Sequence, residues 1–349
     1  MRATAARRAD RGANAREDDR IGPLLSTDQS HRTLDRMLRR AGEPRDALSV
    51  SWDEPADFDR WFVCPTVTPL YYAPVYGELT RGEQLRYNHL TAIYFNELIG
   101  YFETSFAVSV LAAVGRAEAA GDDARFSAAL RQFVADEQEH TRWWRQLTRL
   151  SQPSAANEIQ PPLFQIPSAL GTLLGKLLAR PRLFPAAFWI MLVLEERSLD
   201  ISRRSLRLEV GEIEPRYREV YRKHMEHEAA HVALDCQLLE RYFAPRSRPL
   251  RWLNARLFRT ALRKFLLPPV RGAKRVVERW IAECPQLAGR RTEILGQLEA
   301  VGSSPDYHRM MYSRTSTPIA FSLFDRFPEM HALDRVLLCY APAVKDRDR

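Results

Sequence analysis

The spacing of apolar side chains predicts a protein built from long helices. Between residues 80 and 243, apolar positions recur every three to four residues, and helix start and stop signals divide them into four long runs. We expect helices over about 84–114, 122–150, 186–208 and 215–243, and a shorter one near 168–179. No segment shows the alternation of a strand, and no glycine-rich phosphate loop is present in the sequence. The pattern therefore predicts an all-α fold.

The flanking segments differ from this central part. Residues 1–45 are rich in arginine and poor in large apolar residues, which predicts a disordered basic arm. Residues 50–78 are rich in aromatic residues and proline and are expected to form an irregular packed strap. We expect one domain over 46–340, with a catalytic bundle at about 80–243 and accessory helices at about 246–340.

The charge of the chain is unevenly distributed. The 349 residues carry a formal net charge of +8, yet the segment Arg241–Val277 alone holds eleven basic residues and no acidic one. The remainder is slightly acidic, which argues against a nucleic-acid-binding protein. Four widely spaced cysteines suggest reduced thiols and a cytoplasmic location. The longest apolar run, Leu183–Leu194, is too short to span a membrane.

Two of the predicted helices carry the motif Glu-x-x-His, which places a carboxylate and an imidazole one turn apart on one face. The first is Glu137-x-x-His140, and the second belongs to the longer string His224-x-x-x-Glu228-x-x-His231. By composition, Glu-x-x-His is expected about 0.6 times by chance, but the longer string only about 0.01 times. The three residues of the longer string form one narrow stripe along the helix.

Two Glu-x-x-His helices and a single glutamate from each of two other helices are the arrangement of di-iron carboxylate sites in ferritin-like bundles. In the first helix, Glu103 is preferred over Glu97 because its neighbours one turn away are more apolar. In the third helix, Glu195 and Glu196 lie 100° apart, so only one can easily face the metal, and Glu196 is favoured.

These residues resemble the p-aminobenzoate N-oxygenase (AurF-like) di-iron enzymes over about residues 80–240. The similarity runs through Asn96–Glu103, Leu194–Asp200 and the two Glu-x-x-His motifs, and the additional histidine His224 is its most specific part. Carried over by motif, it implies the metal ligands Glu103, Glu137, His140, Glu196, His224, Glu228 and His231, with Glu97 and Glu195 as alternates. Family members often have an acidic residue directly before the second glutamate and an arginine before the last histidine, where this chain has His227 and Ala230.

The resemblance implies a ferritin-like or ribonucleotide-reductase-like bundle that holds two iron ions (Fe2+/Fe3+) and activates O2. It implies N-oxygenation of a small-molecule arylamine in secondary metabolism, in a homodimer. The sequence has no flavin or nicotinamide motif, so a separate electron donor or reductase is expected. The residues leave open a C-hydroxylase or desaturase acting on an aliphatic or carrier-tethered substrate, and a non-catalytic helical interaction protein.

Other side chains have simpler interpretations. We expect Asp136 and Glu139 to be solvated, Cys236 to lie in the core, and His89, His308 and His331 to have no metal role. Five aromatic residues are candidates for a substrate pocket or for core packing: Tyr94, Tyr101, Trp143, Trp144 and Tyr221.

The basic helix expected over Arg248–Leu267 is amphipathic. It either packs on the bundle with solvated arginines or offers a surface to an acidic partner or a membrane. The sequence places one set of residues on its apolar side (Leu250, Leu253, Leu257, Ala261, Leu262, Phe265) and another elsewhere (Arg251, Arg256, Arg259, Arg263).

Overall fold

The computed structural model describes residues 27–41, 48–118, 123–152, 161–166, 180–267 and 271–342, and isolated residues between 167 and 179. This part of the chain is built of helices and short turns, and its only β-type pairing is an isolated bridge between Trp61 and Ile213. The predicted all-α fold is confirmed. The helix expected near 168–179 lies largely outside the described residues.

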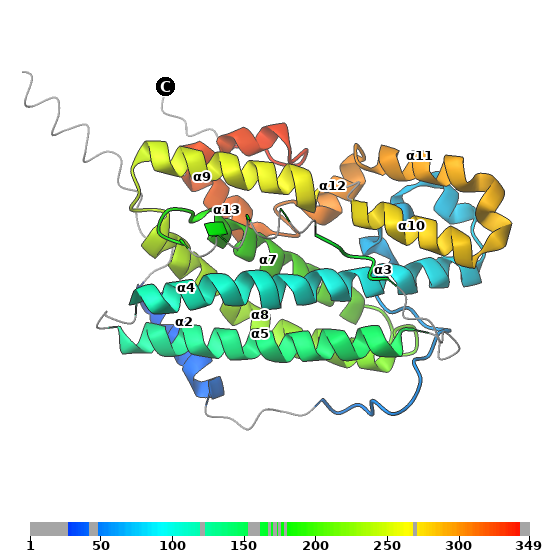
Figure 1. Ribbon diagram of the computed structural model, residues 1–349, viewed down its shortest axis with the longest axis horizontal. Coiled ribbons are helices and arrows are strands. Elements are labelled where there is room, and N and C mark those ends of the chain that lie inside the picture. The colour runs from blue at the N-terminus through cyan, green and yellow to red at the C-terminus, as the bar shows by residue number, and fades with distance from the viewer. Residues whose placement is uncertain are drawn as a thin grey trace, which may run out of the picture.

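Four long rods form the central bundle (Figure 1). The first is a continuous helical run made of α3 (Arg81–Tyr101), the π-helix η4 (Phe102–Ala107) and α4 (Val108–Glu118). The others are α5 (Ala124–Leu150), α7 (Ala186–Leu206) and α8 (Pro215–Tyr242). α3 packs on α5, and α7 packs along α8. The four predicted long helices are therefore present.

Local sequence signals explain where two of these helices begin. Thr80 and Glu83 form a capping box, in which the Thr80 hydroxyl accepts from the Glu83 amide and the Glu83 carboxylate accepts from the Thr80 amide. Asp123 caps α5 by accepting a hydrogen bond of 3.0 Å from the Phe126 amide.

The first rod is long and apolar enough, by length and hydropathy alone, to cross a membrane. In the structure it is a bundle helix that packs on α5 and brings Glu103 into the protein interior. The apolar composition of this rod is therefore explained by its place in the core of the bundle.

The segment Thr27–Ala41 forms a helix, α2, so the prediction of a disordered arm over residues 1–45 is wrong for this part. α2 packs across α5 and α8 and buries Leu34 and Met37 in the core. Two apolar side chains one turn apart give it an apolar face, and the surrounding arginines concealed that pattern in the sequence. Residues 1–26 and 42–45 lie outside the described residues.

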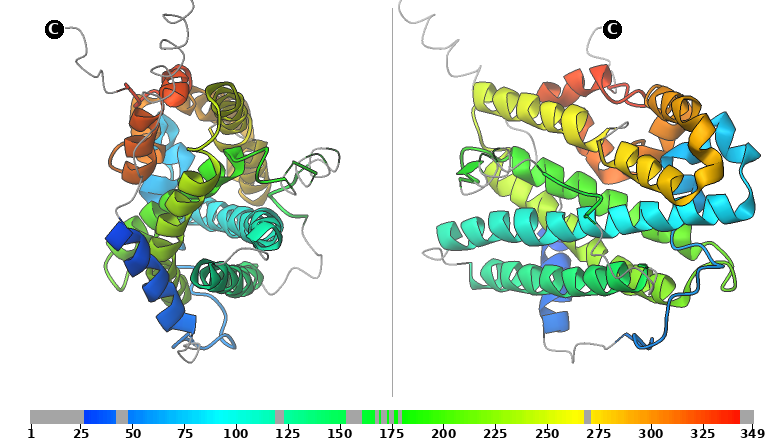
Figure 2. Two further views of the ribbon diagram at one scale, coloured as in Figure 1. Left: turned by 90° about the vertical axis from the view of Figure 1, so that its left-hand side faces the viewer. Right: turned by 45° about the vertical axis from the view of Figure 1, so that its right-hand side comes forward.

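Accessory elements cover one side of the bundle (Figure 2). They are α9 (Arg248–Ala261), the π-helix η5 (Leu262–Leu266), α10 (Arg271–Glu283), η6 (Pro285–Arg290), α11 (Arg291–Val301), α12 (Pro305–Met311), α13 (Pro318–Arg326) and η7 (Pro328–Arg335). α10 packs on α3, while α9 and α13 pack on α7. Gly272 of α10 lies against the ring of Tyr94, where a β-carbon would collide with the ring. The expected strap contains three short 3-10 turns (Pro65–Val67, Pro69–Tyr72, Pro74–Glu78), and Val67, Leu70 and Val75 are fully buried.

The amphipathic pattern expected for Arg248–Leu267 is partly wrong. Arg251 is buried and forms an ion pair with Glu329, whereas Leu253 and Phe265 are exposed. Ala255 and Phe258 are among the residues that face the core instead. The π-helix at the end of α9 changes the angular spacing of side chains, so a regular 100° pattern does not place Phe265 correctly.

The bundle has two apolar cores, one at each end. Along each long rod, the buried apolar residues change from one core to the other near a short polar stretch. On α5, for example, Phe133 belongs to the first core and Trp143 to the second. The polar stretches of the four rods lie at the same level, between the cores, and they carry the buried carboxylates and histidines.

Candidate metal centre

Each of the four rods contributes one fully buried glutamate to a single cluster: Glu103 of η4, Glu137 of α5, Glu195 of α7 and Glu228 of α8. Three buried histidines complete it, His140 of α5 and His224 and His231 of α8. None of the seven residues is more than 3% exposed. The Glu-x-x-His spacing explains why α5 and α8 each present a carboxylate and an imidazole on one face.

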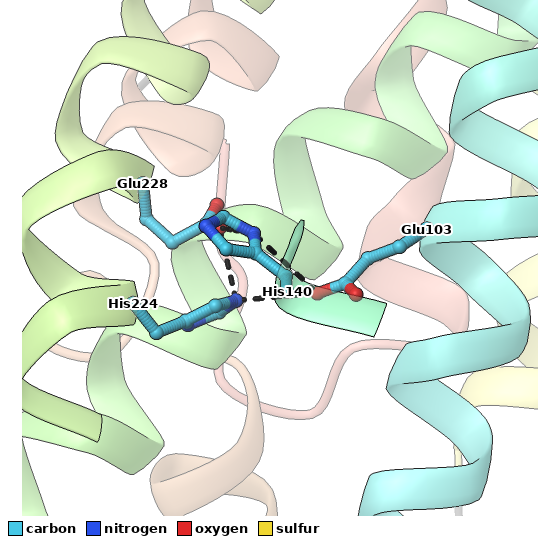
Figure 3. A group of neighbouring side chains, drawn as sticks. All are labelled: Glu103, His140, His224 and Glu228. Atoms are coloured by element: carbon cyan, nitrogen blue, oxygen red, sulfur yellow. Dashed lines mark hydrogen bonds and ion pairs between the residues drawn. The ribbon is translucent and has the colours of Figure 1, made fainter. Parts of the chain in front are cut away.

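The first half of the cluster contains Glu103, His140, His224 and Glu228, and the side chains point toward one another from three helices (Figure 3). The His224 Nε2 atom lies 3.0 Å from Glu228 Oε1 and 3.2 Å from Glu103 Oε1. The His140 Nδ1 atom lies 3.3 Å from Glu228 Oε1. These donor atoms all lie within 4.8 Å of one another, which is a spacing that one metal ion can bridge.

The second half contains Glu137 and His231 and shares His140 and Glu228 with the first. The His231 Nδ1 atom lies 3.4 Å from both Glu137 Oε1 and Glu228 Oε1. Glu228 therefore lies between the two halves, where a carboxylate can bridge two metal ions.

Several donor atoms of the cluster lack hydrogen-bond partners, and their close polar neighbours are other members of the cluster, which is the strongest sign that it fits a metal. Among the described residues, no hydrogen bond reaches either oxygen of Glu137 or Glu228, Oε1 of Glu195, or Nδ1 of the three histidines. Buried polar atoms without partners are costly, and buried charges are normally paired or bound to a metal. Carboxylate oxygens and imidazole nitrogens in this number suit two iron ions, because four carboxylates balance the charge of two ferrous ions.

The electrostatics of the cluster without metal are unfavourable. Burial, together with the nearby Glu103 and Glu228, raises the pKa of Glu137 well above its usual value. Burial likewise raises the pKa of Glu103 to about 7. Glu228 is the exception, because the charges of His224 and His231 outweigh burial and hold its pKa well below the usual value.

The preference for Glu196 over Glu195 is wrong. The Glu195 side chain is 3% exposed, its Oε1 has no hydrogen-bond partner among the described residues, and it lines the same cavity as Glu103. Burial and the charges of the neighbouring Glu228 and Glu137 raise the pKa of Glu195 well above its usual value. The Glu196 carboxylate turns away and accepts hydrogen bonds of 2.8 and 2.7 Å from the amides of Ile319 and Ala320. It caps α13, and that contact depends on a helix more than 100 residues further along the chain, which local sequence does not reveal.

The choice between Glu97 and Glu103 follows the expectation. Glu103 lies in the cluster, where Trp144 Nε1 donates to its Oε1 at 2.9 Å and Thr141 Oγ1 donates to its Oε2 at 3.3 Å. Glu97 lies outside and accepts a hydrogen bond of 2.8 Å from the Phe164 amide.

Outer partners distinguish the three histidines. Asp136 was expected to be solvated, but it is buried, and its Oδ2 lies 3.2 Å from His231 Nε2. His227 Nδ1 lies 2.9 Å from His140 Nε2. A histidine therefore occupies the position where the family often has a carboxylate. The Nδ1 atom of His224 has no hydrogen-bond partner among the described residues.

Asp235 belongs to the same stripe and was not predicted. It follows His231 by four residues, is fully buried, and has no hydrogen-bond partner for either oxygen in the described part of the chain. The i, i+4 spacing after His231 was the available signal. Cys236 is buried in the apolar core, as expected.

An apolar cavity reaches the cluster from the side of the accessory helices. It has a free volume of about 100 Å³, and Glu103 and Glu195 lie among its lining residues. Phe265, 44% exposed, is its most exposed lining residue. Much of the aromatic and apolar lining comes from α3, α7, η5, α10, α12 and the residue that follows α12, and includes Tyr94, Phe95, Ile99, Leu194, Tyr307 and Tyr312.

Of the five aromatic residues considered for a substrate pocket, only Tyr94 lines this cavity. Tyr101 borders a separate, more open pocket on the outside of α3 and α5. The rings of Trp143 and Trp144 pack beside His140 and His224, and Tyr221 lies against Trp144.

A helical bundle with a buried cluster of four glutamates and three histidines defines the class of carboxylate-bridged metalloproteins. Residues 27–293 match the family model of the p-aminobenzoate N-oxygenase AurF, and the chain belongs to this family. The family is that of di-iron oxygenases, as the sequence motifs indicated. A search of curated proteins finds no match for the chain.

Proposed function

We propose that this protein is a di-iron, O2-dependent N-oxygenase that acts on an amine of the arylamine type. The observation that carries the proposal is the set of buried donor atoms that face one another without hydrogen-bond partners at one level of the bundle, in a chain of this family. The residues that would hold iron are Glu103, Glu137, His140, Glu195, His224, Glu228 and His231.

The iron ions, when bound, would supply the activation of O2. The protein's own residues would fix their positions, since Trp144 and Thr141 hold the Glu103 carboxylate and Asp136 and His227 hold the rings of His231 and His140. The two apolar cores would keep bulk water from the cluster on both sides.

The cavity supports an aromatic or otherwise apolar substrate. Most of its lining is aromatic or aliphatic, and Arg197 is its one basic lining residue. A flat ring would pack against Tyr94 and Phe95 and direct its amine toward the inner end, where Glu103 and Glu195 lie.

We further propose a separate reductase as electron donor, a homodimer, a cytoplasmic location and a role in secondary metabolism.

The test is metal analysis followed by a single-turnover reaction. Protein loaded with ferrous iron is expected to hold two irons per chain and, after exposure to O2, to convert a panel of para-substituted anilines to N-oxygenated products detected by mass. Glu137→Ala should lose iron and activity, whereas Glu97→Gln, outside the cluster, should keep both. Products hydroxylated or desaturated at carbon would instead establish the alternative reaction.

A further inference from the structure

The outward face of α9 and η5 carries exposed basic and exposed large apolar side chains together. Its inward face is fixed in the core: Phe258 and Leu262 are fully buried, Arg251 pairs with Glu329, and the Asn254 side chain accepts a hydrogen bond from the Ala186 amide. The outward face therefore belongs to a helix held in place by its other side.

The cations on this face have no acidic partners. Of the basic residues in Arg241–Val277, three pair with acidic residues of the protein (Arg241, Arg251, Lys274) and three donate to main-chain carbonyls (Arg246, Arg259, Arg275). No ion pair reaches the other five within the described part of the chain, and all five are exposed. Four of them belong to α9 and η5 (Arg248, Arg256, Arg263, Lys264), and Arg271 begins α10. Charge complementarity therefore favours an acidic occupant.

Large apolar side chains stand among these cations. Trp252 is 54% exposed and Leu253 43% exposed at one end, and Phe265 is 44% exposed at the other. The Arg256 guanidinium lies 5.8 Å from the Trp252 ring centre. Tryptophan and arginine are the residues most enriched at the centres of protein interfaces. Phe265 follows Trp252 by 13 positions, which is about 20 Å along a helix and matches a partner helix of three to four turns.

A membrane surface or a second copy of the chain fits this face less well. An interfacial helix buries a continuous apolar side in lipid, but most of the apolar side of α9 is already packed in the protein, and only Trp252, Leu253 and Phe265 of α9 and η5 are large apolar residues that remain exposed. A symmetric dimer through this face would bring its four unpaired cations close to the same four cations of the second copy. An acidic protein meets neither difficulty.

The position of the face indicates what such a partner would deliver. Phe265 and Leu266, at its end, line the cavity that reaches Glu103 and Glu195. An electron donor is less suited to this face. The hydrogen-bonded pair of His140 and half-buried His227 leads from the metal cluster toward the surface, and His227 does not line the cavity, so this route does not end beside α9. A partner docked along α9 lies instead beside the route that a substrate would take.

We propose that the outward face of α9 and η5 docks a small acidic carrier protein that presents the substrate on a flexible arm to the cavity beside Phe265. This rests on the proposed function, because the arm is taken to carry the amine that the metal centre oxidises. Trp252 and Phe265 would anchor the two ends of the interface, and Arg256, Arg263 and Lys264 would meet the acidic helix of the carrier.

The test measures binding and turnover separately with the iron-loaded full chain. The probe is a holo acyl-carrier protein bearing a 4-aminobenzoyl group, with fluorescence anisotropy as the binding readout. Its Kd is expected to rise at least ~10-fold between about 50 and about 300 mM NaCl, and at least ~10-fold in Arg256→Glu/Lys264→Glu. The control Arg131→Glu/Arg207→Glu makes the same charge change at exposed positions on α5 and after α7 and should bind normally.

The other arms separate the alternatives. Binding that is equal for the two double variants overturns the proposal, as does tighter binding of anionic vesicles or of a plant-type ferredoxin than of the carrier. If free anilines are oxidised but the carrier does not bind, the docking proposal fails and the N-oxygenase stands. If the carrier binds through α9 but no amine in any form is oxidised, the N-oxygenase fails instead.

Discussion

At the scale of single residues, Glu195 and Glu196 are neighbours in the chain with opposite surroundings. We expect Glu195→Ala to reduce bound iron below two per chain, because it removes a carboxylate at the cluster. Glu196→Ala should keep two irons per chain but lower the free energy of unfolding by about 1–3 kcal/mol, because two amides at the start of α13 lose their acceptor. Iron content and urea unfolding of the two variants check this, and the reverse assignment would show iron loss in Glu196→Ala.

His227 provides a second test at this scale. If His140 binds metal through Nδ1, its Nε2 atom donates a hydrogen bond to His227 Nδ1, and this bond fixes the ring. His227→Leu is expected to weaken iron binding by about 10- to 100-fold. His227→Asn, whose side-chain oxygen can accept the same bond, should bind iron nearly as the wild type does. Competition with a chelator measures both, and equal losses in the two variants would mean that the ring acts only by packing.

Six of the seven proposed iron ligands could be predicted from the sequence, because their identity depends on spacing within one helix. Glu137, His140, His224, Glu228 and His231 follow from the Glu-x-x-His motifs, and Glu103 from its apolar neighbours. The seventh could not, because the helix that turns Glu196 away is distant in sequence. The burial of Asp136 does not follow from the local sequence for the same reason, since its partner His231 lies on another helix.

At the scale of elements, the extents of the long helices were predictable, but the register within the first rod was not. The π-helix Phe102–Ala107 holds an extra residue per turn, so the residues beyond it are rotated relative to a regular α-helix. This turn carries Glu103 and occurs at the level of the polar cluster. The spacing of apolar residues along 81–118 shows that a helix is present, but it does not show at which residue the π-helix rotates the buried side of the helix.

The ion pair that holds α9 gives the prediction for this scale. Arg251 and Glu329 have side chains 5% and 3% exposed, and Arg251 Nε lies 3.0 Å from Glu329 Oε1. Arg251→Ala should lower the free energy of unfolding by about 3–5 kcal/mol, because Glu329 is left buried without its counter-charge. The double variant Arg251→Met/Glu329→Met should lose much less. Urea unfolding measures both, and a single variant as stable as the wild type would contradict the role of the pair.

At the scale of the whole molecule, the metal centre connects the two apolar cores and its occupancy should govern stability. Removing iron with a chelator is expected to lower Tm by at least ~5 °C, because the buried donor atoms lose their partners. Glu137→Gln should remove this response, since it removes a ligand. In metal-free protein the same variant should be as stable as the wild type or more stable, because it relieves repulsion with Glu103 and Glu228. Calorimetry of the iron-loaded and metal-free forms of both proteins measures the two expected changes in Tm, the loss on metal removal in the wild type and the equal or higher Tm of the metal-free variant.

His89 makes the stability depend on pH independently of the metal. Burial lowers the pKa of His89 from 6.5 to about 4, and its Nε2 atom lies 2.9 Å from the Arg60 carbonyl oxygen. Below pH 6.5 the unfolded chain binds a proton there that the folded protein does not, so stability is lost as pH falls from 6.5 to 4.

The contribution of His89 is at most about 1.4 kcal/mol per pH unit. His89→Gln, which can still donate to the carbonyl, should lack this part of the loss. The free energy of unfolding of the metal-free wild type and variant is measured at about pH 7.5 and about pH 5. An equal loss of stability in the two proteins between these pH values would contradict the role of His89.

The apolar passage to Glu103 and Glu195 has a consequence for the gas that the proposed reaction consumes. A small uncharged molecule such as O2 partitions from water into apolar surroundings, so the cavity would hold it at a higher concentration than the solvent does. The same lining that favours an aromatic ring would therefore also store the oxidant. A bound substrate that fills the cavity would then displace this local supply, so the order in which the two molecules arrive would affect the rate.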